Sequence, residues 1–165
     1  MDVWVGMMAT DSLDKLIQEG LHNLKHEEYQ EALQIFDASE ASNNPLWFYG
    51  KATTLFKMKN SDGNLDLESM EEIVELYDAS LSADPRLADS YLMLGLAYTK
   101  KAGLEAMQYK QNHSPERYSA ILGSLHNAEI NLSRAAELNS RFAALVSTDL
   151  EYVKRKKRAM QEKLQ

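Results

Sequence analysis

The 165-residue sequence contains no cysteine, only three prolines and only seven glycines. Without cysteine the chain has neither a disulfide framework nor a thiolate ligand for a metal ion. It also lacks any run of about 20 consecutive apolar residues, which a membrane-spanning helix requires. Residues 1–9 lack the basic region of a secretion signal. These absences predict a cytoplasmic protein without a membrane span.

The residues that are abundant favour helices. Alanine, leucine, glutamate, lysine and methionine are common, and all have high helix propensity. The length suits one domain with its own core. The net charge is −7, but residues 140–165 carry seven Lys/Arg against three Asp/Glu, whereas the rest carries eleven against twenty-two. An acidic body of this kind argues against binding of nucleic acid.

Apolar residues at three- and four-residue spacing mark seven amphipathic stretches. Turn and helix-stop residues separate them near 26–27, 43–45, 60–64, 84–85, 112–115 and 139–140. This pattern predicts an all-α fold of three antiparallel helix pairs and a seventh, C-terminal helix. We expect a flexible segment over residues 1–10 and a single domain over 11–165. Within that domain the helix pairs cover about 12–44, 45–85 and 86–139, and the last helix about 140–163.

The second helices of the three pairs share a pattern of side-chain size. A small or medium residue is followed by a large one four positions later and by a small one seven positions later. Residues at these offsets share one helix face, and small side chains there let a neighbouring helix approach closely. The three sets are Ala32, Phe36 and Ser39; Ile73, Tyr77 and Ser80; and Ala128, Leu132 and Ala135.

These residues resemble the tetratricopeptide repeat (TPR) family, in which Trp-x2-Leu-Gly-x2-Tyr on a first helix precedes Ala-x3-Phe on a second. The third pair matches the first-helix motif at Tyr91, Leu94, Gly95 and Tyr98, and the first pair matches at Leu16, Gly20, Tyr29, Ala32 and Phe36. In the second pair Trp47 and Gly50 lie one residue closer together than the motif requires. The resemblance implies a right-handed solenoid of three irregular repeats with a capping helix, and a non-enzymatic role in protein binding.

The distance between the two motifs grows along the chain. Gly20 and Ala32 are twelve residues apart, Gly50 and Ile73 twenty-three, and Gly95 and Ala128 thirty-three. The extra residues fall between the paired helices. We therefore expect the later hairpins to be longer or to carry looped tips, and to project from one edge of the stack.

In the TPR family the first helix of each pair lines a concave peptide-binding groove. The resemblance places Asp14, Ile17, Leu21, Leu24 and Lys25 there in the first repeat, and Asp89, Leu92, Leu96, Thr99 and Lys100 in the third. The Lys, Asn and Arg side chains with which some members clamp a peptide carboxylate are absent. The resemblance thus implies an adaptor or chaperone-like protein with an apolar groove for an apolar or amphipathic peptide or helix.

The sequence does not decide among several candidate occupants of this groove. They are a partner's helix, the chain's own residues 3–8 or its seventh helix, and a second copy of the chain. Alternatively, the leucines form the core of their hairpins in a shifted register.

The seventh helix ends in a basic run that includes Lys154, Arg155, Lys157 and Arg158. Cations near a helix C-terminus interact favourably with its dipole and aid solubility. The alternative is a contact with an acidic partner, an anionic lipid surface or the acidic body of a second copy. The last option makes self-association, with the basic helix on an acidic surface, the second functional hypothesis.

The sequence offers little for catalysis, metals or cofactors. His22 and His26 have a spacing that can hold zinc, but they lack a well-placed third ligand. Residues 60–66 resemble a calcium loop only in part, because Met58 and Ser69 stand at its first and last ligand positions. We predict no catalytic residue, no metal and no cofactor.

Overall fold

The computed structural model describes the backbone over residues 2–39 and 43–163, and side chains from Ser12 onwards. Over these residues the chain forms seven α-helices and no strand. Of the described helices, none is long and apolar enough to cross a membrane. The helices are α1 Asp2–Lys25, α2 Tyr29–Ala38, α3 Pro45–Ser61, α4 Leu67–Ala83, α5 Ala88–Gln111, α6 Pro115–Leu138 and α7 Arg141–Glu162.

Local capping residues fix several helix starts. The side chain of Asn44 accepts hydrogen bonds from the backbone N–H groups of residues 46 and 47, and Pro45 opens α3. Asp66 caps α4 in the same way, and Ser114 caps α6 ahead of Pro115. Each cap satisfies a backbone donor that the first helical turn leaves free. Residues 60–66, which partly resemble a calcium loop in sequence, include the turn between α3 and α4, where Gly63 adopts a φ of +70°.

The first helix is longer than the sequence predicted. We expected it to begin near residue 11, after a flexible segment, but α1 begins at Asp2. The helix runs through Thr10, Asp11 and Ser12, although residues of these types commonly cap the start of a helix. The flexibility of residues 1–10 stays a prediction, and residue 1 lies outside the described part of the chain.

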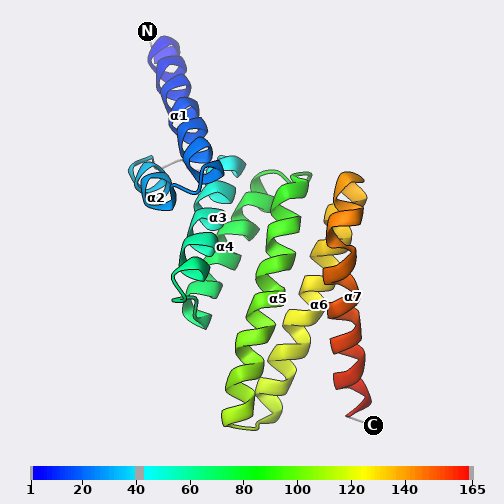
Figure 1. The fold of residues 1–165 in the computed structure, drawn as a ribbon. Helices are drawn as coiled ribbons and strands as arrows, with labels where there is room; N and C mark the ends of the chain where they lie inside the picture. Colours follow the sequence, from blue (N-terminus) through cyan, green and yellow to red (C-terminus); the bar gives the residue numbers. More distant parts are fainter. Residues whose placement is uncertain (1, 40–42, 164–165) are drawn as a thin grey trace.

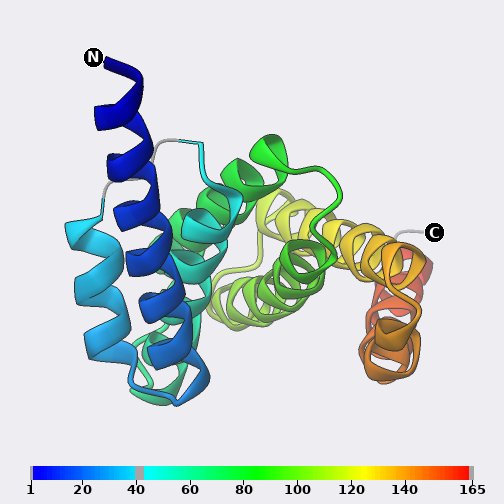
Figure 2. The same ribbon diagram turned by 90° about the horizontal axis from the view of Figure 1, so that it is seen from above.

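The helices are stacked in chain order, with α1 at one end and α7 at the other (Figures 1 and 2). Each helix packs on the next, and α1 also contacts α3, α3 contacts α5, and α5 contacts α7. The buried residues form four clusters along the stack, each built from two or three successive helices. The core is therefore distributed along the stack, as the prediction of packed helix pairs requires.

The repeated pattern of the second helices lies in the core. All nine of its residues, from Ala32 to Ala135, are at most 3% exposed. Glycines on the facing helices allow the close approach. A Cβ atom added at Gly20 would lie 2.8 Å from the ring of Phe36, one at Gly50 would collide with the same ring, and one at Gly95 would lie 2.6 Å from Leu132. Phe36 and Leu132 thus act as the contact points between helices.

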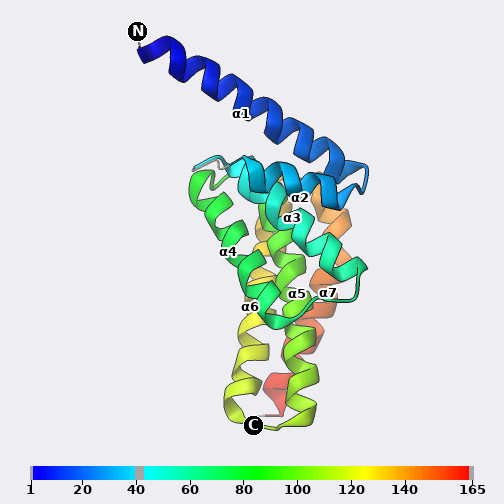
Figure 3. The same ribbon diagram turned by 90° about the vertical axis from the view of Figure 1, so that its left-hand side faces the viewer.

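The third hairpin is the longest of the three. Helices α5 and α6 each contain 24 residues, whereas α3 and α4 each contain 17 and α2 contains 10. Residues 112–114 alone connect α5 to α6, so the extra residues lengthen the helices instead of forming a looped tip. The end of this hairpin extends beyond the shorter helices (Figure 3), which confirms the predicted projection.

A buried carboxyl group between α5 and α6 makes stability depend on pH. Glu105 is 9% exposed and its Oε2 atom has no hydrogen-bond partner. Burial raises the pKa of Glu105, while a hydrogen bond with Ser124 and the charge of Lys101 lower it to a smaller extent. The folded state therefore favours the protonated form, and ionisation above the unfolded pKa destabilises it.

As the pH rises from about 4 to 8, we expect Glu105→Gln to become more stable relative to wild type. The reason is that only wild type has a buried carboxyl group at position 105, whose ionisation destabilises the folded state. Urea unfolding of both proteins at the two pH values measures the difference. A free-energy difference between the two proteins that does not change with pH would contradict the assignment.

Candidate functional site

In the first repeat, the predicted groove residues are mostly core. Ile17 is 2% exposed and Leu24 is 7% exposed. Leu21 is half-buried and packs on the cluster that Leu24 forms with Phe36. Lys25 is exposed. Ile17 and Leu24 therefore belong to the core of their hairpin, which was the alternative interpretation of the groove residues in the sequence.

In the third repeat, the chain's own last helix covers part of the predicted surface. Leu92 is 9% exposed and shares a cluster with Leu132 on α6 and Val146 on α7. Leu96 packs against the edge of the same cluster and stays partly exposed. Of the occupants that the sequence left open, the seventh helix thus lies on Leu92.

A groove remains where α3, α5 and α7 meet. It has a volume of about 570 Å³ and includes three of the predicted residues, Leu96, Thr99 and Lys100. The other lining residues come from all three helices: Phe56 and Asn60 from α3, Gly103 from α5, and Asp149 and Tyr152 from α7. We take this α3/α5/α7 groove as the candidate functional site.

The α3/α5/α7 groove combines apolar side chains with a mixed polar margin. Phe56 and Leu96 are half-buried, and Tyr152 is 41% exposed. Lys100 and Asp149 supply one charge of each sign. The Thr99 hydroxyl already donates to the Gly95 carbonyl at 2.9 Å. A ligand would bind there through apolar contacts, and the groove would favour neither a positively nor a negatively charged ligand.

The groove continues into a second hollow between α5 and α7. This hollow has a volume of about 230 Å³ and shares Thr99, Gly103 and Tyr152 with the groove. Its walls include Ile121, Leu125 and Met160. Gly103 lies at the junction, and a Cβ atom added there would meet no atom within 4 Å. The missing side chain at Gly103 keeps the two hollows connected.

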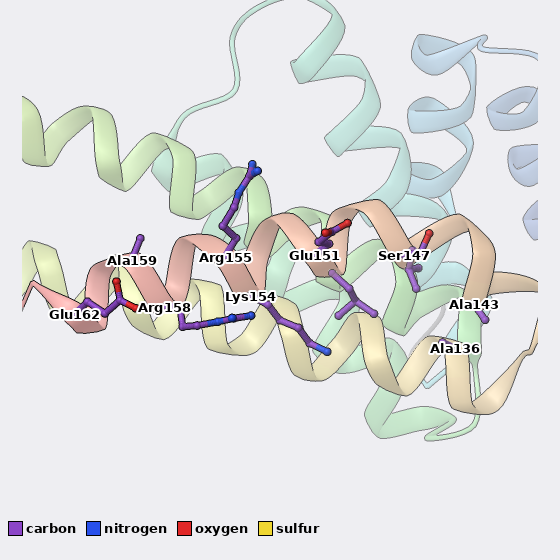
Figure 4. Close-up of a pocket in the computed structure, with 11 residues that line it drawn as sticks. Ala136, Ala143, Ser147, Glu151, Lys154, Arg155, Arg158, Ala159 and Glu162 are labelled. Carbon is purple, nitrogen blue, oxygen red and sulfur yellow. The ribbon is translucent and has the colours of Figure 1, made fainter.

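The basic run of α7 divides into two parts. Lys157 pairs with Glu129 of α6. Lys154, Arg155 and Arg158 are exposed, and they line a different groove, between α6 and α7. In Figure 4, Lys154 and Arg158 extend along the α6 side of α7, whereas Arg155 points to the opposite side.

The structure brings together no further candidates for metal chemistry. The His22 and His26 rings lie 4.4 Å apart. In the described part of the chain, no three His, Cys, Asp or Glu side chains gather in a geometry that could hold a metal ion.

Sequence reasoning missed the groove residues on α3 and α7. The second repeat departs from the TPR spacing, so Phe56 and Asn60 had no assigned position. We treated the seventh helix as a cap, so Asp149 and Tyr152 were not considered as groove residues. The available signal was Tyr152, an aromatic residue two positions before the basic run.

Comparison with known proteins adds no family assignment. No protein-family model matches the sequence, and no curated protein is similar to it.

Proposed function

We propose that this chain is a cytoplasmic, non-enzymatic protein-binding module of TPR type, an adaptor or chaperone-like protein, which holds an amphipathic helix of a partner protein. The binding site in this proposal is the α3/α5/α7 groove. The observation that carries it is the meeting of Phe56, Leu96 and Tyr152 from three helices around one open hollow.

The contacts between helices support a curved stack. Odd-numbered helices contact one another along the chain, whereas even-numbered helices of the described chain do not. In a superhelix of helix pairs, the inner helices lie closer together than the outer ones. We therefore place α1, α3, α5 and α7 on the inner, concave side, where repeat proteins bind their partners.

The side chains of the groove favour an amphipathic helix as the ligand. Phe56, Leu96 and Tyr152 offer apolar contact to one face of such a helix. Lys100 and Asp149 lie at the same hollow and can meet polar residues on its flanks. A wholly apolar ligand would leave these two charges without solvent or partner, at a cost in free energy.

Filling the groove at Gly103 should block binding without harming the fold. Gly103→Leu places a large side chain at the junction of the two hollows, where an added Cβ meets nothing. A fluorescein-labelled synthetic helix of ~18 residues, with leucine at every third and fourth position and no net charge, serves as the probe. We expect fluorescence anisotropy to show binding to wild type and affinity at least about tenfold weaker for Gly103→Leu.

Gly123→Leu provides the matched control. Gly123 is also helical and also has open space at its Cβ, but it lies on α6 and does not line the groove. Its affinity for the probe should equal that of wild type. Equal affinity of all three proteins, or no binding to wild type, would overturn the proposed function.

A further inference from the structure

A second groove lies along the last helix pair and shares no lining residue with the α3/α5/α7 groove. It runs between α6 and α7 and has a volume of about 830 Å³ (Figure 4). Apolar side chains lie along it: Ala136 from α6, and Ala143, Leu150 and Ala159 from α7. Because α7 is the last helix of the stack, no other described helix covers this α6/α7 groove.

Basic residues line the α6/α7 groove in its second half. Lys154 and Arg158 extend along the α6 side of the groove, whereas Arg155 lines it but points away from α6 (Figure 4). All three are exposed, and none of the three ion pairs of the described residues includes them. Two carboxylates, Glu151 and Glu162, also line the groove, but neither lies within ion-pair distance of these cations. The groove therefore suits a ligand with an apolar face and negative charge.

The opposite end of the stack carries a segment with those properties. The first turns of α1 project away from the other helices (Figures 1 and 3), and α1 contacts only α2 and α3. Residues 2–14 contain no cation. Their apolar residues include Val3, Trp4, Val5, Met7 and Met8, and their acidic residues are Asp2, Asp11 and Asp14. Trp4, Met7, Met8 and Asp11 follow the three- and four-residue spacing that is typical of one helix face.

From this complementarity we infer that residues 2–14 of one copy dock in the α6/α7 groove of a second copy. Thirteen helical residues extend about 20 Å, and the stretch of α7 from Ala143 to Glu162 extends about 29 Å, so the segment fits within the groove. An intramolecular contact is ruled out by geometry, because α1 and α7 lie at opposite ends of the stack.

The two surfaces differ, so the contact is heterologous and joins copies head to tail. A contact of this kind leaves a free segment at one end and a free groove at the other, and growth continues unless the rotation closes a ring. The docked helix also gives α7, an end helix of the stack, a further neighbour beside α5 and α6. Attraction between the cations and the aspartates makes the association sensitive to salt.

Charge reversal on each surface tests the inference in the full chain. We expect wild type to form concentration-dependent oligomers in sedimentation velocity at low salt, and smaller species at high salt. Lys154→Glu with Arg158→Glu, and separately Asp11→Lys with Asp14→Lys, should each sediment as monomers. Mixing the two double variants restores opposite charges across the contact, so the mixture should associate again.

The control carries the same charge change at another place. Lys57→Glu with Lys110→Glu alters exposed lysines on α3 and α5 that line neither groove, and it should associate like wild type. Gly103→Leu should also associate like wild type, which separates this inference from the proposed function. A wild type that stays monomeric at every concentration, or a mixture that stays monomeric while circular dichroism shows both variants folded, would overturn the inference.

Discussion

The variant Phe36→Ala should lose about 3–5 kcal/mol of unfolding free energy, the largest stability effect that we expect of any single substitution in this chain. Phe36 is fully buried on α2 and its ring fills the space that Gly20 of α1 and Gly50 of α3 leave open. The backbone carbonyl of Phe36 also accepts a hydrogen bond from the indole N–H of Trp47 at 3.0 Å. Removing the ring leaves a cavity where three helices meet.

Urea unfolding measures this loss, with Ile130→Ala as the control. Ile130 is 51% exposed on α6, so its truncation should change stability by less than about 0.5 kcal/mol. Gly50→Ala offers a check on the mechanism. Its added methyl group should destabilise wild type by collision with the ring, and it should destabilise the Phe36→Ala background less. A loss below about 1 kcal/mol for Phe36→Ala would contradict the assigned role of the ring.

The second large effect concerns Gly95, where α5 packs closely against Leu132 of α6. A Cβ atom at this position would lie 2.6 Å from Cγ of Leu132 and 3.0 Å from the Leu132 backbone nitrogen. Because a backbone atom is involved, a change of rotamer cannot relieve the overlap and α6 itself must shift. We expect Gly95→Ala to lose about 1–3 kcal/mol, the usual range for overpacking, even though alanine is the better helix former.

Gly103→Ala is the matched control on the same helix. Nothing lies within 4 Å of an added Cβ at Gly103, so only the gain in helix propensity remains, up to about 1 kcal/mol. The two substitutions should therefore shift the urea midpoint in opposite directions. A shift of the same sign and size in both variants would show that Gly95 is not a close contact.

The helices and their packing faces were predictable because their signals are local. Asn44 with Pro45, and Ser114 with Pro115, stop one helix and cap the next within a few residues. The repeated offsets of four and seven residues determine which side chains share a face, whatever lies opposite. The start of α1 was mispredicted because residues 10–12 are good capping residues, yet the helix passes through them.

The candidate site was only partly predictable, because it depends on how separate helices are rotated relative to one another. Leu92 and Leu96 are four residues apart on α5, yet α7 buries the first and leaves the second at the groove. The second repeat departs from the spacing of the motif, so the sequence did not predict that Phe56 and Leu96 line the same groove. Tyr152 enters the site only because α7 packs back across α5, a contact between helices distant in sequence.

Photo-crosslinking from position 152 tests the central claim, the binding of an amphipathic helix in the α3/α5/α7 groove, most directly. Tyr152 is replaced by p-benzoylphenylalanine, a photoreactive aromatic residue that is larger than tyrosine, and the protein is irradiated with the labelled helix used as probe. The same residue at position 130, exposed on α6 and outside the groove, serves as the control. We predict a covalent adduct at position 152 that is absent at position 130 and is lost when Gly103→Leu fills the groove. Equal adducts at both positions, or an adduct that persists with Gly103→Leu, would contradict the account.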